Sequence, residues 1–410
     1  MRINELKKYK RILTLGHGVE GKSSYDFIKK YCPNTEIGIS DIKDGVDYLD
    51  KQNEYDLIIK SPGISKRLLK KLHTTATNIF FANFKGIIIG ITGTKGKSTT
   101  STLIYQMLKA AGRDVFLAGN IGTPALSYLS SSNTSKTICV MELSSYQLDD
   151  ICYSPHVAVI TSIFPDHMNY HNSFENYLTA KLNICRFQNK QDWLIYDSKG
   201  TDLHKYLNSI KSKKIEVKHN KLTETKKLKI IGEHNIKNIN LAASVAEIFS
   251  VKSNVIQTVI SNFEGLPHRL QNLGTFSGIT FIDDAASTTP ESTILAIRSI
   301  DKINTILLGG LDRGYNFELL CRTIDKSSIE NIVLFKDTGF MIKEKLAQIT
   351  KRKFNYLHAA SMEEAVLWVY RVTRANTVCL LSSASPSYTL WKNFTDKGNQ
   401  FKRFVLKFAS

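Results

Sequence analysis

The stretch IIIGITGTKGKSTTSTLIYQML, residues 87–108, decides the fold of the middle of this chain. An apolar run typical of a buried strand breaks into glycines, lysines and hydroxyls, and a helical pattern follows from Ser98 onward. Glycines let backbone N–H groups turn toward an anion, and the N-terminus of a helix adds partial positive charge. The stretch therefore predicts a loop between a strand and a helix that holds the phosphates of a nucleotide.

Two side chains of this loop have defined uses at a nucleotide. Lys97 can reach the β- and γ-phosphates, and the Ser98 hydroxyl can take one position around Mg²⁺. The loop is a variant, because Ile91 stands where the pattern GxxxxGK[ST] has glycine. A lysine-rich turn without a ligand is the alternative, but strand, glycines, GKST and helix together favour ATP. The residues expected at the nucleotide are Gly93, Thr94, Lys95, Gly96, Lys97, Ser98 and Thr99.

The composition indicates a globular protein of two or three domains, since the chain has 410 residues with 42% hydrophobic and 22% charged residues. Its apolar runs are far shorter than a membrane span, and the first residues show no signal peptide. Six cysteines are scattered without a CxxC pair, which fits a reducing compartment. We therefore expect a cytoplasmic protein with no membrane partner.

The net charge of +18 raises the question of an anionic partner. The lysines are dispersed, with the densest run at residues 211–229, and no RNA-binding or helix-turn-helix signature is present. We therefore expect no nucleic-acid partner. A basic P-loop NTPase that acts on nucleic acid remains the alternative from a different class.

Strand-like runs alternate with helix-sized segments along the whole chain, which predicts an α/β fold with mostly parallel sheets. We expect a Rossmann-like N-terminal domain (1–85), a P-loop-type central ATPase domain (86–266) and a Rossmann-like C-terminal domain (267–410). Ligands should lie beyond the carboxyl ends of the strands. The expected strands are 11–16, 36–41, 56–63, 87–92, 138–145, 157–163, 278–284, 305–310, 331–337 and 377–383.

A second glycine motif lies in the first domain. GHGVEG fits GxGxxG with Gly16, Gly18 and Gly21, and Asp41 ends the next expected strand. Taken alone, this spacing is a dinucleotide-binding fingerprint and suggests an NAD-dependent oxidoreductase. A lone GxGxxG is weak evidence, and a Rossmann-like fold can hold other nucleotides.

Eight motifs in chain order make the sequence similar to the Mur ligase superfamily, ATP-dependent amide-bond ligases that build the peptidoglycan stem peptide. One such motif is weak evidence, whereas eight in order are highly specific. Within the superfamily, GHGVEG, SPGI (61–64), ELSSYQL and the terminal SxxxSxxxxxxNF pattern resemble the MurD branch, which adds glutamate. The eight motifs are TGTKGKSTT (92–100), GNIG (119–122), MELSSYQL (141–148), PDHMNYH (165–171), AKLNI (180–184), GEHNIKN (232–238), LPHR (266–269) and LLSSASPSYTLWKNF (380–394).

The resemblance implies a cytoplasmic, monomeric ligase with UDP-MurNAc-L-alanine and glutamate as its small-molecule substrates. ATP would phosphorylate the carboxylate of the nucleotide sugar, and the amine of glutamate would attack the acyl phosphate. Both steps gather negative charge, so cations should dominate the site. Folylpolyglutamate synthase is a rival of the same class, but that enzyme usually begins close to its phosphate loop, whereas a whole predicted domain precedes this one.

The resemblance also implies two Mg²⁺ ions and their ligands. Ser98 and Glu142 would hold one ion, and His167 would bind the second. Lys181 matches a family lysine carried as a carbamate, an anion that suits Mg²⁺ better than an ammonium does. Lys97, His167 and Lys181 are the expected catalytic residues; without the family match, the last two would read as an ordinary polar residue and a helical lysine.

Further residues are placed by the resemblance. Asn235 and Asn238, three apart and on one helical face, would lie at the adenine side, although Asn235 could simply cap its helix. Arg269 would contact the ATP phosphates through its fork of donors, and Asp284 would lie near the ribose and phosphates. Contacts to the nucleotide sugar are expected from Gly18, Val19, Asp41, Ile42, Gly63 and Asn120. Contacts to glutamate are expected from Thr288, Arg313, Ser387 and Phe394.

The sequence departs from the family at three positions. Lys95 replaces the usual asparagine of the loop, Asn169 replaces an aspartate, and Ala286 stands where common MurD enzymes carry a lysine near the amino acid. The DDAASTTP stretch is similar to a divergent MurD branch, some members of which add L-glutamate. D-glutamate is the expected substrate, and L-glutamate is the alternative.

Overall fold

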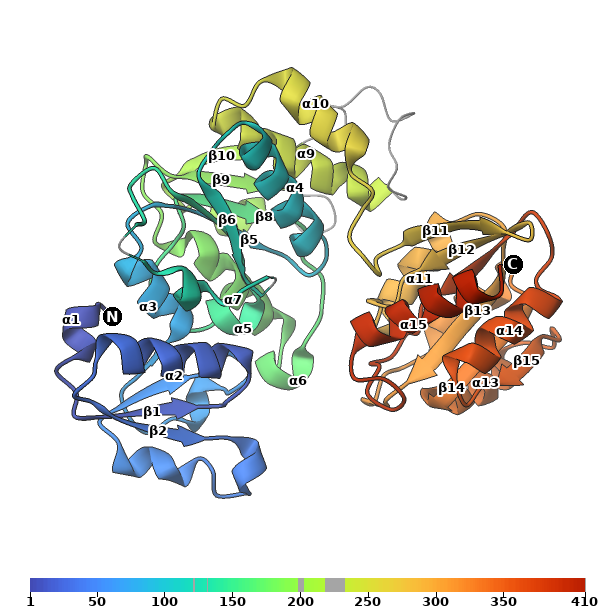
Figure 1. Cartoon of the computed structure of the whole chain (residues 1–410), viewed down its shortest axis with the longest axis horizontal. Coiled ribbons are helices and arrows are strands. Elements are labelled where there is room, and N and C mark those ends of the chain that lie inside the picture. The colour runs from blue at the N-terminus through green and yellow to red at the C-terminus, as the bar shows by residue number, and fades with distance from the viewer. Residues whose placement is uncertain (121, 131, 198–202, 218–232, 410) are drawn as a thin grey trace. The chain divides into compact units, whose positions relative to one another are not determined.

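A computed structural model describes residues 1–120, 122–130, 132–197, 203–217 and 233–409. Their strands form three sheets (Figure 1). The described residues up to 217, together with 234–262, make one compact unit that contains the first two sheets, and 263–409 make the second unit. Ile121 of GNIG, the start of GEHNIKN and most of the lysine-rich run 211–229 lie outside the described residues.

The first sheet is parallel, with strand order β2-β1-β3-β4. Strand β1 pairs with β2 on one side and with β3 on the other. Because these strands are parallel, the loops that follow β1, β2 and β3 lie at the same edge of the sheet. The strands are β1 (Arg11–Leu15), β2 (Glu36–Ser40), β3 (Leu57–Lys60) and β4 (His73–Thr75). The helices are α1 (Ile3–Leu6), α2 (Val19–Tyr31), η1 (Ile42–Asp44), η2 (Asp50–Glu54), η3 (Lys66–Leu68) and α3 (Ala76–Asn83).

The central sheet is also parallel, in the order β10-β9-β8-β5-β7-β6. Its middle strand β5 (Ile87–Thr92) is apolar because strands and helices cover it on every side. The other strands are β6 (Val115–Gly119), β7 (Ile138–Glu142), β8 (Val157–Ile160), β9 (Trp193–Tyr196) and β10 (Lys213–Glu216). The helices are α4 (Lys97–Ala110), η4 (Ala125–Tyr128), α5 (Ser145–Leu148), α6 (Met168–His171), α7 (Phe174–Arg186), α8 (His204–Leu207), α9 (Glu233–Ile248) and α10 (Ser253–Asn262).

One apolar core runs through the first two sheets. It contains Ile12 and Leu57 from the first sheet and Met141 from the central sheet. Between them the Phe80 and Phe84 rings stack with centroids 4.9 Å apart. This shared core explains why the two sheets form one compact unit, and the predicted domain boundary at residue 85 stays a prediction.

The third sheet has the order β11-β12-β16-β13-β14-β15, and alternate residues of its strands point to opposite faces. Leu308 packs on one face with α11, α12 and α13, while Leu307 packs on the other with α14 and α15. The strands are β11 (Gln271–Phe276), β12 (Ile279–Asp283), β13 (Ile303–Gly310), β14 (Asn331–Asp337), β15 (Asn355–His358) and β16 (Thr377–Leu381). The helices are α11 (Pro290–Ser299), α12 (Glu318–Asp325), α13 (Thr338–Ile349), α14 (Met362–Val372) and α15 (Phe394–Lys407).

The expected α/β fold with mostly parallel sheets is confirmed, and each of the ten expected strands is present. One pairing differs, because β11 runs antiparallel to β12. The reason is a tight turn at Ser277 and Gly278, whose φ angles of +50° and +76° suit a two-residue hairpin. In the part of the chain that the structure describes, no helix has the length and apolarity to cross a membrane.

Candidate active site

The phosphate loop lies between β5 and α4 as predicted, and two of its glycines are fixed by close contacts. Gly96, with φ +88°, is the cap of α4, and a Cβ there would lie 2.2 Å from the Asn238 side-chain oxygen. A Cβ at Gly93 would lie 1.9 Å from the Thr161 hydroxyl. Larger residues would therefore displace the loop or its neighbours.

The first half of this loop is anchored to the segment after β8. The backbone N–H of Thr94 donates to the Ser162 carbonyl, and that of Lys95 donates to the Ser162 hydroxyl at 3.1 Å. The Thr94 hydroxyl pairs with the Tyr177 hydroxyl at 2.8 Å, and the Thr161 hydroxyl donates to the Lys95 carbonyl at 2.6 Å. The N–H groups expected to face a phosphate are thus those of the second half of the loop.

Two lysines converge on one backbone carbonyl of the loop. Lys97 Nζ donates to the Gly93 oxygen at 3.0 Å, and Lys181 Nζ donates to the same oxygen at 2.7 Å. Lys181 is buried, with its ammonium 4.7 Å from the centre of the Tyr177 ring. Burial, strengthened by the charge of Lys97 and opposed by Asp166 and Glu142, holds the pKa of Lys181 well below its ordinary value. Lys97 and Lys181, two of the three residues predicted to be catalytic, therefore meet at one carbonyl oxygen of the loop.

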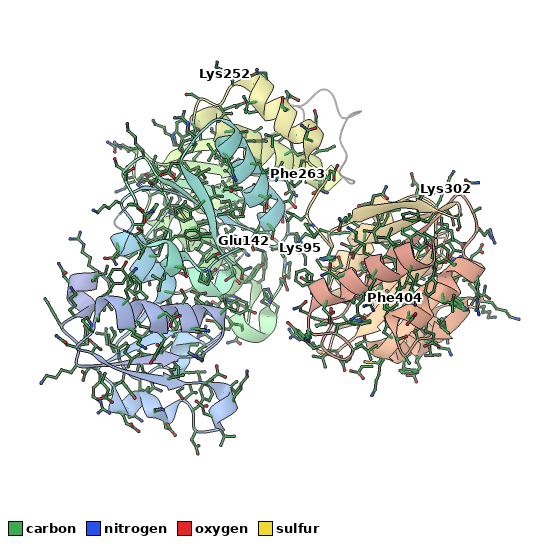
Figure 2. All side chains as sticks on the ribbon, viewed as in Figure 1. Lys95, Glu142, Lys252, Phe263, Lys302 and Phe404 are labelled. Carbon is green, nitrogen blue, oxygen red and sulfur yellow. The ribbon has the colours of Figure 1, made fainter. Side chains whose placement is uncertain are left out.

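Glu142 is the last residue of β7 (Figure 2), and it is paired in register with Ile91 of β5, the strand that leads into the loop. Its side chain is buried; Oε1 accepts a hydrogen bond from the Asn120 amide at 2.9 Å, and Oε2 is buried without a hydrogen-bond partner. An unpartnered buried carboxylate oxygen is costly unless a cation meets it. Because Mg²⁺ prefers oxygen ligands, Glu142 and the half-buried Ser98 fit this ion.

His167 caps the short helix α6 in a left-handed conformation, with φ +57°. Its Nε2 lies 3.6 Å from Asp166 Oδ2, and its ring centre lies 5.0 Å from that of Tyr146. Burial lowers its pKa; Asp166 opposes this effect, while Lys181 adds to it. A neutral imidazole can offer a lone pair to a metal or a proton. Within the described residues no three His, Cys, Asp or Glu side chains cluster as a metal site, so a metal here would need the Ser98 hydroxyl or a modified Lys181 as well.

Asn235 and Asn238 share one face of α9, as predicted, and their side chains are hydrogen-bonded at 3.2 Å. The helix begins at Glu233, so the alternative of Asn235 as its cap is wrong. The close approach of Asn238 to Gly96 brings this pair next to the phosphate loop.

The carboxyl edge of the first sheet carries the GxGxxG loop. A Cβ at Gly21 would lie 1.9 Å from the Gly16 carbonyl oxygen, so α2 starts in close contact with the loop. Asp41 accepts a hydrogen bond from the His17 backbone N–H at 2.6 Å. This bond, together with one from the Lys43 N–H, lowers the pKa of Asp41 and keeps it ionised.

The other residues predicted at this edge leave room for a ligand. Val19 is 77% and Ile42 is 72% exposed. Gly18 and Gly63 lie in loops where an added Cβ would meet no atom. Exposed apolar side chains beside open backbone suit the ring of a nucleotide.

In the second unit, Asp284 follows β12 and is buried. It accepts hydrogen bonds from the Ser382 hydroxyl at 2.9 Å and from the Leu270 backbone N–H at 3.2 Å. Burial raises its pKa to about 6, although these bonds and the charge of the exposed Arg269 oppose the rise. Asp284 therefore holds the loops at this edge together.

The four residues predicted to contact glutamate lie at one edge of the third sheet. Three of them are in loops, and the fourth is the first residue of a helix. The Ser387 hydroxyl is buried without a hydrogen-bond partner, which makes it the strongest anchor for a ligand among them. Phe394 begins α15 and is 39% exposed, with its ring centre 6.4 Å from that of His268. Thr288 is half-buried and Arg313 is exposed.

Two buried polar residues were not predicted from the sequence. His171 is buried against the Ser145 hydroxyl at 3.0 Å, and burial lowers its pKa to about 4. Lys397 is fully buried and hydrogen-bonded to the Ser383 hydroxyl, and burial lowers its pKa to about 7 despite the charges of Asp283 and Asp284. No local pattern separates either residue from a surface histidine or a helical lysine.

The sequence is similar to ligases named UDP-N-acetylmuramoylalanine–D-glutamate ligase. That of Oenococcus oeni is 32% identical, over 97% of this chain and 97% of the relative. That of Streptococcus agalactiae is 34% identical over 85% and 82%, and that of Acetivibrio thermocellus 32% over 88% and 84%. Residues 91–226 also match the family described as Mur ligase middle domain.

Solved structures share the fold at low sequence identity. MurC of Thermotoga maritima has a TM-score of 0.61 with 18% identity and covers 98% of this chain and 99% of its own. MurF of Thermotoga maritima in complex with ADP gives 0.62 with 14% identity, and 99% of each chain is covered. FolC of E. coli in complex with DHPP and ADP gives 0.59 with 14% identity, over 81% and 92%.

Proposed function

The chain belongs to the Mur ligase family, and on this premise we propose how its residues carry out the reaction of the MurD branch. It is an ATP-dependent ligase that adds D-glutamate to UDP-N-acetylmuramoylalanine in peptidoglycan precursor synthesis. This membership excludes the NAD-dependent oxidoreductase and the nucleic-acid NTPase. The folylpolyglutamate synthase alternative is supported by fold alone.

The observation that carries the assignment is the convergence of Lys97 and Lys181 on the Gly93 carbonyl beside the unpartnered oxygen of Glu142. Activation of a carboxylate by ATP transfers a phosphoryl group between two anions, so fixed cations lower its barrier. We assign Lys97 to the β- and γ-phosphates. The amine of glutamate then displaces phosphate from the acyl phosphate, forming the amide bond.

Ser98 and Glu142 would hold one Mg²⁺, and His167 with a carbamylated Lys181 would hold a second. When bound, these ions neutralise charge on the transferred phosphoryl group. The low pKa of Lys181 supports the carbamate, because a neutral amine can attack CO₂. A new N–C bond then forms and one proton leaves to solvent.

The remaining assignments follow the edges of the sheets. Nucleotide-sugar contacts are proposed for Gly18, Val19, Asp41, Ile42, Gly63 and Asn120. ATP contacts are proposed for the residues 93–99 and for Asn235, Asn238, Arg269 and Asp284. Glutamate contacts are proposed for Thr288, Arg313, Ser387 and Phe394. We further propose three domains (1–85, 86–266 and 267–410), a monomer and a cytoplasmic location.

Release of phosphate tests the function directly. The purified chain is incubated with ATP, Mg²⁺ and UDP-MurNAc-L-alanine, and with D-glutamate or L-glutamate in parallel. We expect release only when all components are present, with D-glutamate preferred. Release that needs no amino acid, or that is equal without the nucleotide sugar, would contradict the assignment. A preference for L-glutamate would assign the pocket around Ala286 to the other enantiomer.

A further inference from the structure

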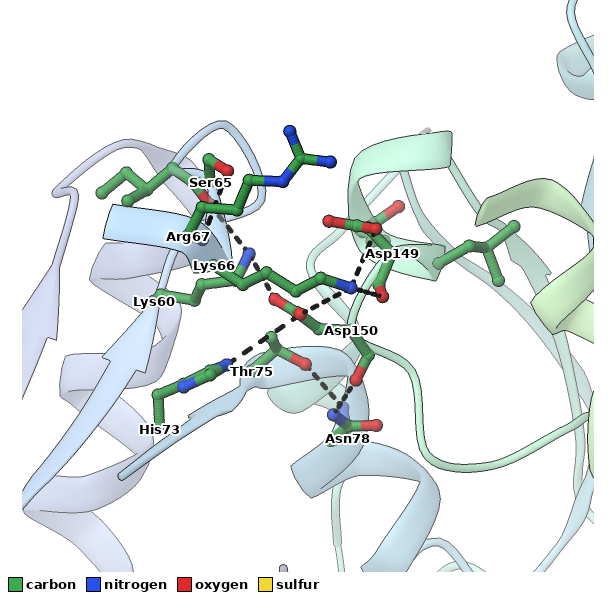
Figure 3. A network of polar contacts seen from close by, with 12 residues as sticks. Lys60, Ser65, Lys66, Arg67, His73, Thr75, Asn78, Asp149 and Asp150 are labelled. Carbon is green, nitrogen blue, oxygen red and sulfur yellow. Dashed lines mark hydrogen bonds and ion pairs between the residues drawn. The ribbon is translucent and has the colours of Figure 1, made fainter. Parts of the chain in front are cut away.

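A buried lysine lies at the carboxyl edge of the first sheet, outside the roles assigned so far. Lys60 is the last residue of β3 (Figure 3), and its side chain has no exposed surface. Its Nζ lies 2.8 Å from Asp150 Oδ2 and donates to the Ile64 carbonyl at 3.0 Å. A buried ion pair often adds little to the stability of a fold, since apolar residues of similar size at the same positions stabilise it as well. The pair therefore calls for a reason beyond stability.

The contact partners of Lys60 belong to two different parts of the site. Ile64 lies in the loop after β3, residues 61–65, which contains Gly63. Asp150 follows α5 in the central domain. A second lysine repeats the connection, because Lys66 Nζ donates to the Asp149 carbonyl at 2.8 Å and to its carboxylate at 3.0 Å (Figure 3). The two lysines flank the loop, and the two aspartates are consecutive.

The carboxylate of Asp150 is held in its charged form. Burial would raise its pKa, but His73, Lys60 and Lys66 together bring the pKa below its ordinary value. The Asn78 amide also donates to the Asp150 carbonyl at 2.8 Å. The anchor for Lys60 is thus fixed through both its side chain and its backbone.

The start of α5 leads to the metal-site residues. Its cap, Ser144, comes two residues after Glu142, and its Tyr146 ring lies beside His167 with centres 5.0 Å apart. The Tyr170 hydroxyl, from α6, reaches Asp149 at 3.4 Å. One short helix therefore has the candidate metal ligands at one end and the anchor of the 61–65 loop at the other.

We propose that Lys60 and Asp150 are positioning residues that hold the 61–65 loop in register with α5, so that a nucleotide sugar bound at this loop presents its carboxylate to the phosphate loop. The proposal rests on the proposed placement of the nucleotide sugar at this edge. Lys60 acts through the Ile64 carbonyl and touches no reacting atom. Its loss should affect the nucleotide sugar and leave ATP binding unchanged.

The test compares steady-state kinetics of the full chain with Lys60→Met and with the double variant Lys60→Met/Asp150→Leu. The double variant replaces the ion pair by apolar side chains and avoids an unpaired buried charge. We expect both to raise the KM for UDP-MurNAc-L-alanine about tenfold or more, with the KM for ATP within about twofold, since the pair acts on one substrate. Lys407→Met, which removes an exposed ion pair with Glu363, is the matched control and should change neither constant.

Thermal unfolding of each variant separates positioning from folding. A double variant as stable as the wild type that keeps the wild-type KM for the nucleotide sugar would overturn the proposal, as would equal changes in both KM values. If Lys60→Met does not fold, the KM values of the double variant alone test the proposal. Absence of turnover in the wild type would instead count against the proposed function.

Discussion

Glu20 should destabilise the folded protein at neutral pH, and Glu20→Gln should therefore stabilise it. The carboxyl group lies in α2, where the Gln147 amide of α5 donates to it at 3.3 Å. Burial raises its pKa from 4.5 to about 7, and the Gln147 bond and the charge of Lys60 oppose only part of this rise. The unfolded chain loses its proton near pH 4.5, while the folded chain keeps it until about pH 7.

The sign and size follow from proton linkage. Between these pH values the folded state binds more protons, so the free energy of unfolding falls as pH rises. At about 1.36 kcal/mol per pKa unit, the rise from 4.5 to about 7 limits the destabilisation by charged Glu20 to at most about 3.4 kcal/mol above pH 7. Because the side chain is only half-buried and solvent screens part of its charge, we expect charged Glu20 to lower the free energy of unfolding by about 1–2 kcal/mol. Glutamine keeps the shape and the bond to Gln147 without the charge.

Urea unfolding of the wild type and Glu20→Gln at pH 5 and pH 8 measures the effect. From pH 5 to pH 8, the free energy of unfolding of the variant should rise by about 1–2 kcal/mol relative to that of the wild type, because only the wild type acquires the charge of Glu20. Glu54→Gln, at an exposed position of η2, controls for the general effect of removing a carboxylate. A stability difference that is the same at both pH values, or a variant less stable than the wild type at pH 8, would refute the reasoning.

Four substitutions test the site itself. Gly96→Ala should weaken ADP binding about tenfold or more in calorimetry, since its Cβ would meet the Asn238 side chain at a positive φ; unchanged affinity would contradict this. Glu142→Gln should lower kcat about a hundredfold or more and raise the Mg²⁺ needed for half-maximal rate, while thermal stability is kept or increased; an unaltered Mg²⁺ dependence would argue against the assignment. Lys181→Ala should be inactive and partly rescued by acetate, so full activity without a short carboxylate would exclude a carbamate role. Ser387→Ala should raise the KM for glutamate about tenfold with the KM for ATP unchanged, because it removes a buried hydroxyl with no protein partner; equal changes in both would point to a folding defect.

The sequence predicted the strand, the glycine loop and the helix of residues 87–108 well because the signals for them are local. The apolar run, the glycines and the helical pattern of residues 87–108 lie next to one another in the chain. The strands that the sequence analysis missed are mostly at sheet edges. In β10 the sequence KKIE is charged and only partly buried, and in β15 the sequence NYLH has no buried residue. Edge strands carry polar residues, so their pattern resembles that of a loop.

Pairings between distant residues could not be predicted from one sequence. Lys60 reads as the polar end of an apolar strand, and only the folded chain brings it to Asp150. The unpartnered Glu142 Oε2 is likewise visible only once the neighbours of β7 are known. The family resemblance supplied Glu142 as a candidate, but nothing in the sequence pointed to Lys60.

The apolar core that the first and central sheets share has a consequence for protein engineering. Ile12 and Leu57 pack in the same core as Met141, so a cut near residue 85 would open apolar surface on both sides. Transplanting the first sheet and its helices from a relative onto this chain would succeed only if the graft also carried matching partners for that surface. The place at which this chain can be joined to part of a relative is therefore set by the packing of the shared core, and residue 85 does not satisfy that condition.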